Sequence, residues 1–523
     1  MIRWRNYFFI LPVLSAVFLI LSFPPWDKGY LAWVFLLPLF FYFREQNYSS
    51  WENGFFPGLV IGIIFFIYLF AYLALAVDFL FPRYMGFLVV AVSSLYSAFF
   101  FGLFTLSLRF FLKTRNILLS TLAIPASWVL LEYFRSLGFL GHTGGFLGYS
   151  QVGYIPLLQA VSLYGYWGLP FLMISFQVVL FISWQNFCKK PKKRLIESAS
   201  SVLVFLIMLG CGLYLPSLFP VEKNDKPVRI ALIQGNITQD DVLDSYMAPK
   251  NFQKYVQLTK DADQLYAPLD LIVWPETVFS LNVARLNPTS EQEVADLADE
   301  TGASILLGAM VEKTQKEVYN SILLQKAGRT SWEEERYDKS RLVPFAEIFP
   351  VPEILNKILP ADVSLGTYTS GTGSQLFYLL DFTIGGIVCF ESYFSRPALE
   401  MAQRGAEHLF VLSNDAWFLD STGLKQHARV AAIRAIETGI GVTQVANTGY
   451  TISFDYTGKE VLSLPALEDG IALLETNLPT RQTLYRLWGD YFVLLCIIIL
   501  LISFIVYLRS PKKLMPIQKN KEN

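Results

Sequence analysis

Apolar runs long enough to cross a membrane fill most of the first 219 residues and return once near the end of the chain. A transmembrane helix needs about 20 consecutive, mostly apolar residues. On that basis we predict about eight spans, at 7–23, 30–43, 55–77, 86–112, 117–134, 155–185, 200–219 and 490–508. Apolar residues make up 53% of the chain and charged residues 16%, against about 25% charged in soluble domains. The sequence therefore predicts a membrane protein and excludes disorder, collagen and coiled coil.

The basic residues of the short loops indicate how the chain crosses the membrane. Loops on one side carry about fifteen Lys and Arg, and those on the other side about three. Basic short loops stay in the cytoplasm, so we expect both termini there. The short span at 30–43 is needed to keep this asymmetry. The first span is expected to be retained as an anchor, because no small-residue cleavage site follows it.

This topology divides the chain into three parts. We predict a seven-span membrane domain at 1–219, an exported domain at 220–487, and a last span with a basic cytoplasmic tail at 488–523. The formal net charge is -1, so no basic field suggests a nucleic acid partner. The chain has only 4 Cys, which excludes a disulfide scaffold.

A glycine-rich loop at 138–153 follows Trp128, Glu132 and Arg135 near a predicted span end. It also contains His142 and Tyr149. One interpretation is interfacial anchoring, with aromatic residues and a snorkelling Arg at the membrane surface. The other is a vestibule for lipid head groups.

The exported part alternates strand and helix patterns. Buried strands are predicted at 229–237, 270–276 and 382–390, with helices such as 251–266 and 425–438 between strands. This alternation is typical of a layered α/β domain. Reactive groups in such folds gather at the carboxyl ends of strands.

Three residues in or near strand ends are candidates for chemistry. Glu276 ends the predicted strand 270–276, Cys389 lies at the end of 382–390, and Lys339 lies in the loop 337–345. Each also has a structural interpretation: a strand-end carboxylate, an inert buried thiol and a solvated loop cation. A nucleophilic thiol, with an ordinary pKa of about 8.5, needs a base or a nearby cation. A buried carboxylate can act as that base, and a Lys can stabilise an oxyanion.

No metal or other cofactor is expected. The chain has 3 His and contains no HExxH or CxxC arrangement.

The same residues lie in strings that resemble the nitrilase superfamily, whose αββα sandwich carries a Glu-Lys-Cys triad. The strings are LIVWPET (271–277), YDKSRLVPFAE (337–347) and VCFES (388–392). Together with the predicted spans, they resemble the apolipoprotein N-acyltransferase family of the bacterial cytoplasmic membrane. LIQGNI (232–237), SNDAWF (413–418), ANTG (446–449) and the pattern WVLLEYFR…GYSQ (128–151) are similar too. The resemblance therefore covers nearly the whole chain.

The resemblance implies a role for several residues. It makes Cys389 the nucleophile, Glu276 the general base and Lys339 the oxyanion-stabilising cation. Glu347 matches a supporting carboxylate, and the matches to substrate-site positions are Glu391 and Trp417. Three departures bear on acyl-donor preference and rate: Phe390 replaces the usual Tyr, Ala346 replaces a Gly, and His142-Thr143-Gly144-Gly145 replaces a Phe-Pro-Trp stretch.

The implied activity is transfer of an acyl chain from a phospholipid to a diacylated apolipoprotein through a Cys thioester. A monomer in the bacterial inner membrane is expected, with its catalytic domain on the periplasmic side. Two alternatives stay open. One is a membrane-tethered nitrilase-type amidase that hydrolyses a small amide. The other is a channel or transporter, disfavoured because the charged pair Glu132 and Arg135 sits near a span end.

Overall fold

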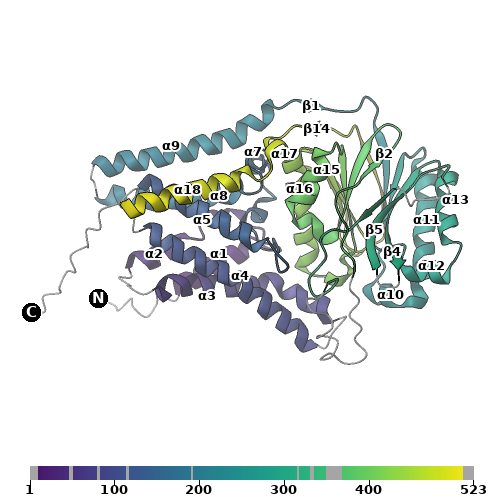
Figure 1. Cartoon of the computed structure of the whole chain (residues 1–523), viewed down its shortest axis with the longest axis horizontal. Coiled ribbons are helices and arrows are strands. Elements are labelled where there is room, and N and C mark those ends of the chain that lie inside the picture. Colours follow the sequence, from purple (N-terminus) through teal and green to yellow (C-terminus); the bar gives the residue numbers. More distant parts are fainter. Residues whose placement is uncertain are drawn as a thin grey trace, which may run out of the picture.

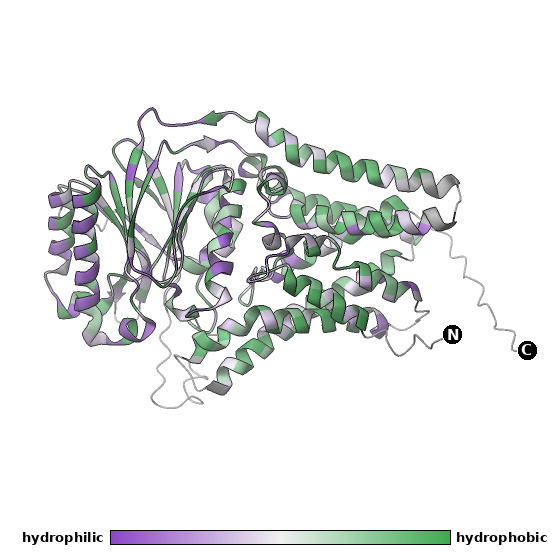
Figure 2. Ribbon diagram, turned by 180° about the vertical axis from the view of Figure 1, so that it is seen from behind, coloured by the Kyte–Doolittle hydropathy of each residue, from purple (hydrophilic) through white to green (hydrophobic). Residues whose placement is uncertain are grey.

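The computed structural model describes residues 10–45, 51–78, 83–112, 117–189, 192–314, 317–329, 335–348 and 368–509. Within these residues the chain forms a bundle of long helices beside an α/β sandwich (Figure 1). The last helix returns from the sandwich into the bundle (Figure 1). Figure 2 shows that hydrophobic residues dominate the bundle, whereas hydrophilic residues line the helices on the far side of the sandwich.

Among the residues that the structure describes, six helices are long and apolar enough to cross a membrane. They are α3 (Glu52–Asp78), α4 (Arg83–Leu112), α5 (Ile117–Arg135), α8 (Gly168–Lys189), α9 (Lys192–Tyr214) and α18 (Tyr491–Arg509). Each overlaps one of the predicted spans. The chain is therefore a membrane protein with a helical bundle, as predicted.

The first two predicted spans are shorter than expected among the described residues. The helix α1 (Ile10–Leu21) has 12 residues, and the next span is divided into η2 (Gly29–Trp33) and α2 (Leu37–Glu45). The predicted span 155–185 is also broken. It forms α6 (Ile155–Leu158), α7 (Ala160–Tyr164) and then α8, with Gly165 between them at φ 66°. Residues 7–9 and the basic tail from 510 lie outside the described residues.

Glycines let α3 and α4 pack closely. A Cβ at Gly58 would lie 2.2 Å from the carbonyl oxygen of Phe101, and one at Gly62 would lie 2.5 Å from the Cα of Ala98. Small residues at such crossings allow van der Waals packing of helix backbones, which holds helices together where lipid removes the hydrophobic driving force.

The α/β part contains two six-stranded sheets. One has the order β12-β11-β10-β9-β8-β7, and the other β13-β2-β3-β4-β5-β6. The first contains β7 (Leu376–Tyr378), β8 (Thr383–Val388), β9 (His408–Ser413), β10 (Gly441–Ala446), β11 (Thr451–Phe454) and β12 (Glu460–Leu464). The second contains β2 (Val228–Gln234), β3 (Leu271–Val273), β4 (Ser304–Thr314), β5 (Glu317–Gln325), β6 (Arg336–Asp338) and β13 (Gly470–Thr476).

Helices cover both outer faces of these sheets. The helices α11 (Ala248–Tyr266) and α13 (Ser290–Thr301) lie on the far side, whereas α15 (Ser395–Gln403) and α16 (Thr422–Thr438) lie between the sandwich and the bundle (Figure 1). Fully buried apolar residues fill the space between the sheets, among them Leu306, Ile322 and Val388. The predicted αββα sandwich is confirmed.

Ion pairs join the sandwich to the bundle. Asp27, in the turn after α1, accepts hydrogen bonds from Lys425 and Arg429 on α16. Farther along α16, the Glu437 carboxylate accepts a hydrogen bond from the backbone N–H of Tyr166, at 2.8 Å. These contacts fix α16, and the loops packed on it, against the membrane helices.

Candidate active site

The structure brings Glu276, Lys339 and Cys389 together. Glu276 lies three residues beyond the end of β3, Lys339 directly follows β6, and Cys389 directly follows β8. The Nζ of Lys339 is 3.5 Å from Oε1 of Glu276. Cys389 interacts electrostatically with both. The three residues come from both sheets, so the cluster forms only when the sandwich is assembled.

Two asparagines hold the Glu276 carboxylate in place. The side chain of Asn320, on β5, donates to Oε1 at 2.8 Å. The backbone N–H of Asn414, just beyond β9, donates to Oε2 at 2.8 Å. Both carboxylate oxygens therefore accept hydrogen bonds, which fix the orientation of the side chain. Asn320 lies in no string singled out in the sequence, and although Asn414 lies in SNDAWF (413–418), its contact with Glu276 arises only in the fold.

Lys339 is a buried cation between two carboxylates. Its side chain is 1% exposed, and Nζ donates to Oε1 of Glu347 at 2.8 Å. Burial acts to lower the pKa of Lys339, but the charges of Glu347 and Glu276 outweigh burial and raise the pKa above its usual value. Lys339 therefore stays protonated at neutral pH.

Glu347 is itself fixed by its own loop. Its Oε2 accepts a hydrogen bond from the backbone N–H of Val343 at 2.7 Å. Asn320 also approaches its Oε1, at 3.3 Å. The Glu347 carboxylate thus contacts Lys339 directly and shares Asn320 with Glu276.

Cys389 sits at a sharp turn. It begins the short turn η6 (Cys389–Tyr393) and has φ 47°, in the left-handed region that non-glycine residues rarely adopt. The strand thus ends at Val388, two residues before the predicted end at Phe390. Burial raises the pKa of the Cys389 thiol well above its usual value; Glu276 adds to this shift and Lys339 opposes it. The thiol is therefore neutral near pH 7 and needs a base to become a nucleophile.

A second buried pair lies next to the nucleophile. The Nε2 of His427, on α16, is 3.2 Å from the carbonyl oxygen of Cys389, and its Nδ1 is 2.8 Å from Oδ1 of Asp415. The same Nε2 also lies 3.1 Å from the Ser392 hydroxyl, so two oxygens share this ring nitrogen. Burial acts to lower the pKa of His427, but Asp415 outweighs burial and raises the pKa. The sequence analysis did not identify this pair.

Glu391 is buried in the protein rather than open to a cavity. Its carboxylate accepts hydrogen bonds from the Tyr337 hydroxyl, from the N–H and hydroxyl of Ser340, and from the N–H groups of Arg341 and Val388. Glu391 is 0% exposed. It therefore ties the loop that carries Lys339 to the turn that carries Cys389.

Two aromatic candidates lie at partly exposed positions around the site. Phe390 packs on Phe394, with ring centroids 5.2 Å apart. Trp417 belongs to the turn η7 (Asp415–Phe418), and the ring of its neighbour Phe418 packs on Tyr72 of α3 at 5.1 Å. The turn is thus in contact with a membrane helix.

One trio among the described residues offers atoms spaced for a metal ion. Cys389, Asp415 and His427 each present a ligand atom, and these lie within 4.8 Å of one another. However, His427 and Asp415 are already hydrogen-bonded to each other. We therefore interpret the trio as a hydrogen-bonded support of the nucleophile.

Comparisons with known proteins match both parts of the chain. The family model described as apolipoprotein N-acyltransferase N-terminal domain matches residues 15–179, and the carbon-nitrogen hydrolase model matches residues 229–486. An apolipoprotein N-acyltransferase from Geobacter metallireducens is 28% identical over 94% of this chain and 93% of its own length. One from Treponema denticola is 26% identical over 94% and 95%. Among solved structures, Nit3 of Saccharomyces cerevisiae, a nitrilase-superfamily member, is 18% identical, covers 49% of this chain and 91% of its own, and has a TM-score of 0.38.

Proposed function

Because the chain belongs to the apolipoprotein N-acyltransferase family, we propose that Cys389 carries a fatty acyl chain from a phospholipid to the N-terminal amine of a diacylglyceryl-modified lipoprotein. The observation that carries this proposal is the arrangement of one thiol, one carboxylate base and one buried cation described above. It is the arrangement that acyl transfer through a covalent intermediate requires.

In the first half-reaction, Glu276 accepts the thiol proton and the sulfur of Cys389 attacks the ester carbonyl carbon of the phospholipid. The oxyanion that forms is stabilised by the ammonium group of Lys339 and by a backbone N–H near Phe390. The ester C–O bond then breaks. Glu276 returns the proton to the leaving oxygen, a lysophospholipid departs, and an acyl thioester remains on Cys389.

In the second half-reaction, the α-amine of the lipoprotein attacks the thioester carbonyl carbon. Glu276 takes a proton from the attacking nitrogen and passes it to the sulfur as the C–S bond breaks, which releases the Cys389 thiol. The product is an amide, and the enzyme returns to its starting state. Because Lys339 stays protonated throughout, it can stabilise both oxyanions.

The contacts around the site support lipid substrates. Phe345, in the Lys339 loop, is 43% exposed and packs on Phe139 beyond the end of α5, with ring centroids 5.6 Å apart. On another side, Phe418 packs on Tyr72 of α3. Membrane helices therefore flank the site, so an acyl chain can reach the thiol from the bilayer. A small-amide amidase would have no use for this arrangement.

The finer points of location follow from the loop charges. We propose that residues 220–487 act as a catalytic domain on the periplasmic side of a bacterial inner membrane. Both termini are then cytoplasmic, and the enzyme works as a monomer.

Mass spectrometry of a model lipoprotein tests the function. Cells that produce the wild-type protein should yield an N-acylated N-terminus, whereas cells with Cys389→Ala should yield the diacylated form with a free amine. The matched control is Cys211→Ala, since Cys211 is a free cysteine on the membrane helix α9. N-acylation by Cys389→Ala at the wild-type level would reject the proposal. Hydrolysis of a small amide, without any need for a lipoprotein amine, would favour the amidase instead.

A further inference from the structure

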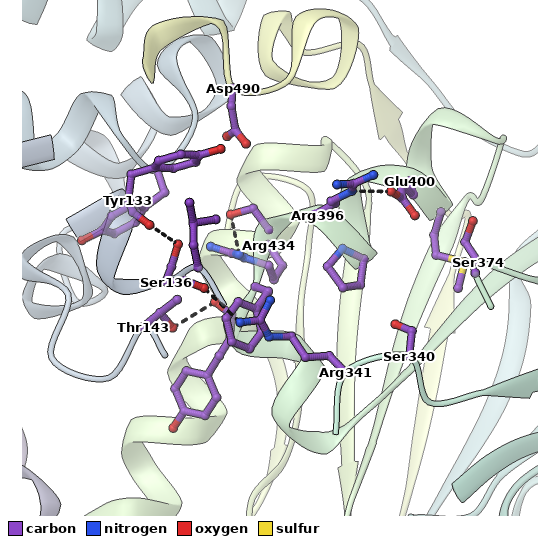
Figure 3. Close-up of a pocket in the computed structure, with 18 of the residues that line it drawn as sticks. Tyr133, Ser136, Thr143, Ser340, Arg341, Ser374, Arg396, Glu400, Arg434 and Asp490 are labelled. Carbon is purple, nitrogen blue, oxygen red and sulfur yellow. Dashed lines mark hydrogen bonds and ion pairs between the residues drawn. The ribbon is translucent and has the colours of Figure 1, made fainter. Parts of the chain in front are cut away.

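A cavity of about 450 Å³ lies between the helical bundle and the sandwich. Its membrane side is formed where three long helices end or begin: Ser136 follows α5, Trp167 precedes α8, and Asp490 precedes α18. Its other walls are the loop at Ser340 and Arg341, and the segment from Tyr393 to Pro397 (Figure 3). None of Glu276, Lys339 and Cys389 lines it.

Most charged groups of this cavity already have partners. The Nε of Arg396 is 2.7 Å from Glu400. On the wall facing the bundle, Asp490 accepts hydrogen bonds from the Trp167 indole and the Tyr485 hydroxyl. The two remaining charged groups of the cavity are the guanidinium groups of Arg341 and Arg434.

Arg341 has unused donors that face this space. Its Nη2 donates to the carbonyl oxygen of Ser136 at 2.9 Å, and its guanidinium lies 3.5 Å from the ring centroid of Phe394. Its Nε and Nη1 donate no hydrogen bond within the described part of the chain, and it has no carboxylate within ion-pair distance there. Arg341 is partly exposed at the cavity wall. An Arg with free donors is suited to a phosphate.

Arg434 adds a second, deeply buried cation. Its side chain is 1% exposed, and Nη1 donates to the Ser395 hydroxyl at 2.6 Å. Its Nε lies 3.0 Å from Glu437 but makes no hydrogen bond. Figure 3 shows Arg341 and Arg434 reaching into the same space. The first turn of α15 also lines the cavity, and no side chain caps its N–H groups.

We propose that this cavity binds the phosphate of a phospholipid head group, held by Arg341 next to Arg434. The lipid is an accessory one, distinct from the acyl donor, because the catalytic residues do not line the cavity. The position fits a lipid, since the cavity lies at the ends of three membrane helices, beside Tyr133 and Trp167, and such aromatic residues mark the head-group level. The glycine-rich loop supplies Thr143, Phe146 and Tyr149 to the same wall.

The binding of this lipid would act on the catalytic loops. Arg341 and Ser340 follow Lys339 directly, and both donate to Glu391, which is joined through Val388 to the nucleophile turn. A phosphate on Arg341 would therefore stabilise the loop that carries the catalytic cation. This inference goes beyond the transfer reaction and depends on the membrane location alone.

The test uses the full chain with Cys389→Ala, which turns over no lipid. Native mass spectrometry counts the short-chain phosphatidylglycerol molecules retained per chain after delipidation. We expect Arg341→Gln to weaken the retention of one lipid by about tenfold. The control Arg285→Gln removes an exposed cation that is paired with Glu312 and lies outside the cavity, so retention should not change. Arg341→Lys should restore part of the loss, because the charge returns without the planar donors.

Two further arms identify the ligand. A diacylglycerol with the same chains but no phosphate should be retained equally by all variants. Inorganic phosphate should displace the accessory phospholipid from the protein with an intact Arg341, an experiment that needs no cavity variant. Equal phospholipid retention by Arg341→Gln and its parent would overturn the proposal. Binding of inorganic phosphate without any competition from phospholipid would overturn the assignment to a lipid. Neither result depends on acyl transfer, which the lipoprotein experiment tests separately.

Discussion

The Nε2 of His427 lies 3.2 Å from the carbonyl oxygen of Cys389 and donates a hydrogen bond to it. Cys389 has φ 47°, a conformation that costs a non-glycine residue on the order of 1–3 kcal/mol. The bond from His427, which Asp415 orients, helps to hold this conformation. We therefore assign His427 a positioning role: it acts through the backbone of the nucleophile and not on the substrate.

Replacing His427 should slow the chemistry without weakening substrate binding. We expect His427→Gln to lower kcat by about tenfold and to leave KM within about twofold, because the thiol is misplaced while the substrate contacts remain. His408→Gln is the matched control. That histidine is also buried, but its Nε2 contacts Thr443 inside the first sheet. Steady-state acylation kinetics give kcat and KM for both variants and so test this prediction. A rise in KM with unchanged kcat would contradict a positioning role.

The same two histidines should affect stability with opposite dependence on pH. The pKa of His427 is raised in the fold, so its contribution is fully present below the unfolded pKa of about 6.5 and is lost as pH rises through the folded pKa. Burial lowers the pKa of His408 to about 3, so its contribution is present above about 6.5 and is lost as pH falls towards 3.

Thermal unfolding of the wild type and the two Gln variants across pH measures these contributions. The gap between wild type and His427→Gln should shrink as pH rises. The gap between wild type and His408→Gln should shrink as pH falls below 6.5. The same pH trend for both variants would contradict the opposite pKa shifts of His427 and His408.

Lys339 should matter for the fold as well as for catalysis. In Lys339→Met, the carboxylates of Glu276 and Glu347 lose their shared cation in a buried site. Removing one partner from a buried ion pair costs about 3–5 kcal/mol in the free energy of unfolding. We expect Lys339→Met to show a loss of this size and no measurable transfer. Urea unfolding of the purified protein measures it, with the exposed Lys260, paired with Glu300, as the control position for a Met substitution. A change below about 1 kcal/mol for Lys339→Met, the size expected of an exposed pair, would contradict a buried ion-pair cluster.

Glu391 offers a separate test of loop coupling. In Glu391→Gln, an amide NH₂ group replaces one carboxylate oxygen. It faces N–H and O–H groups whose hydrogen bonds that oxygen accepted. We expect a loss of about 1–3 kcal/mol in stability, because buried donors stay unsatisfied, together with reduced kcat. Tyr337→Phe removes only one of those donors and should have a smaller effect. The melting temperatures and kcat values of the two variants show which substitution has the larger effect. A larger effect of Tyr337→Phe would show that the hydroxyl, and not the carboxylate, organises the loops.

The candidate catalytic residues at the strand ends could be predicted from the sequence, but the contacts that hold them in place could not. Glu276, Lys339 and Cys389 lie in recognisable strings next to predicted strands, so both the αββα sandwich and the candidate residues could be predicted. The supporting roles of Asn320 and His427 could not, because their partners are distant in sequence and are set only by the pairing of strands and the packing of α16. Asp415 lies in the family-like string 413–418, but its contact with His427 could not be predicted either. Support of this kind is a property of the assembled sandwich.

The membrane helices show a second limit of prediction from the sequence. Hydropathy measures apolar content and not helix continuity, so it predicted 155–185 as one span although the helix is interrupted at Gln159 and at Gly165. Neither interpretation of the glycine-rich loop foresaw the burial of its neighbours. Arg135 was a candidate for snorkelling at the surface, but it is 1% exposed and donates to the carbonyl oxygen of Gly144. Its burial depends on how the loop folds back over α5.

The central claim is that Cys389 forms an acyl thioester with a chain taken from a phospholipid. The most direct measurement is mass spectrometry of the Cys389 peptide after the full-length protein is incubated with phospholipid and no acceptor. We predict an added acyl mass on Cys389 that hydroxylamine removes and that a diacylated lipopeptide discharges. Glu276→Gln should slow its formation by about 10²–10⁴-fold, the usual contribution of a general base. A protein that N-acylates the lipopeptide while Cys389 never carries an acyl group would contradict this account.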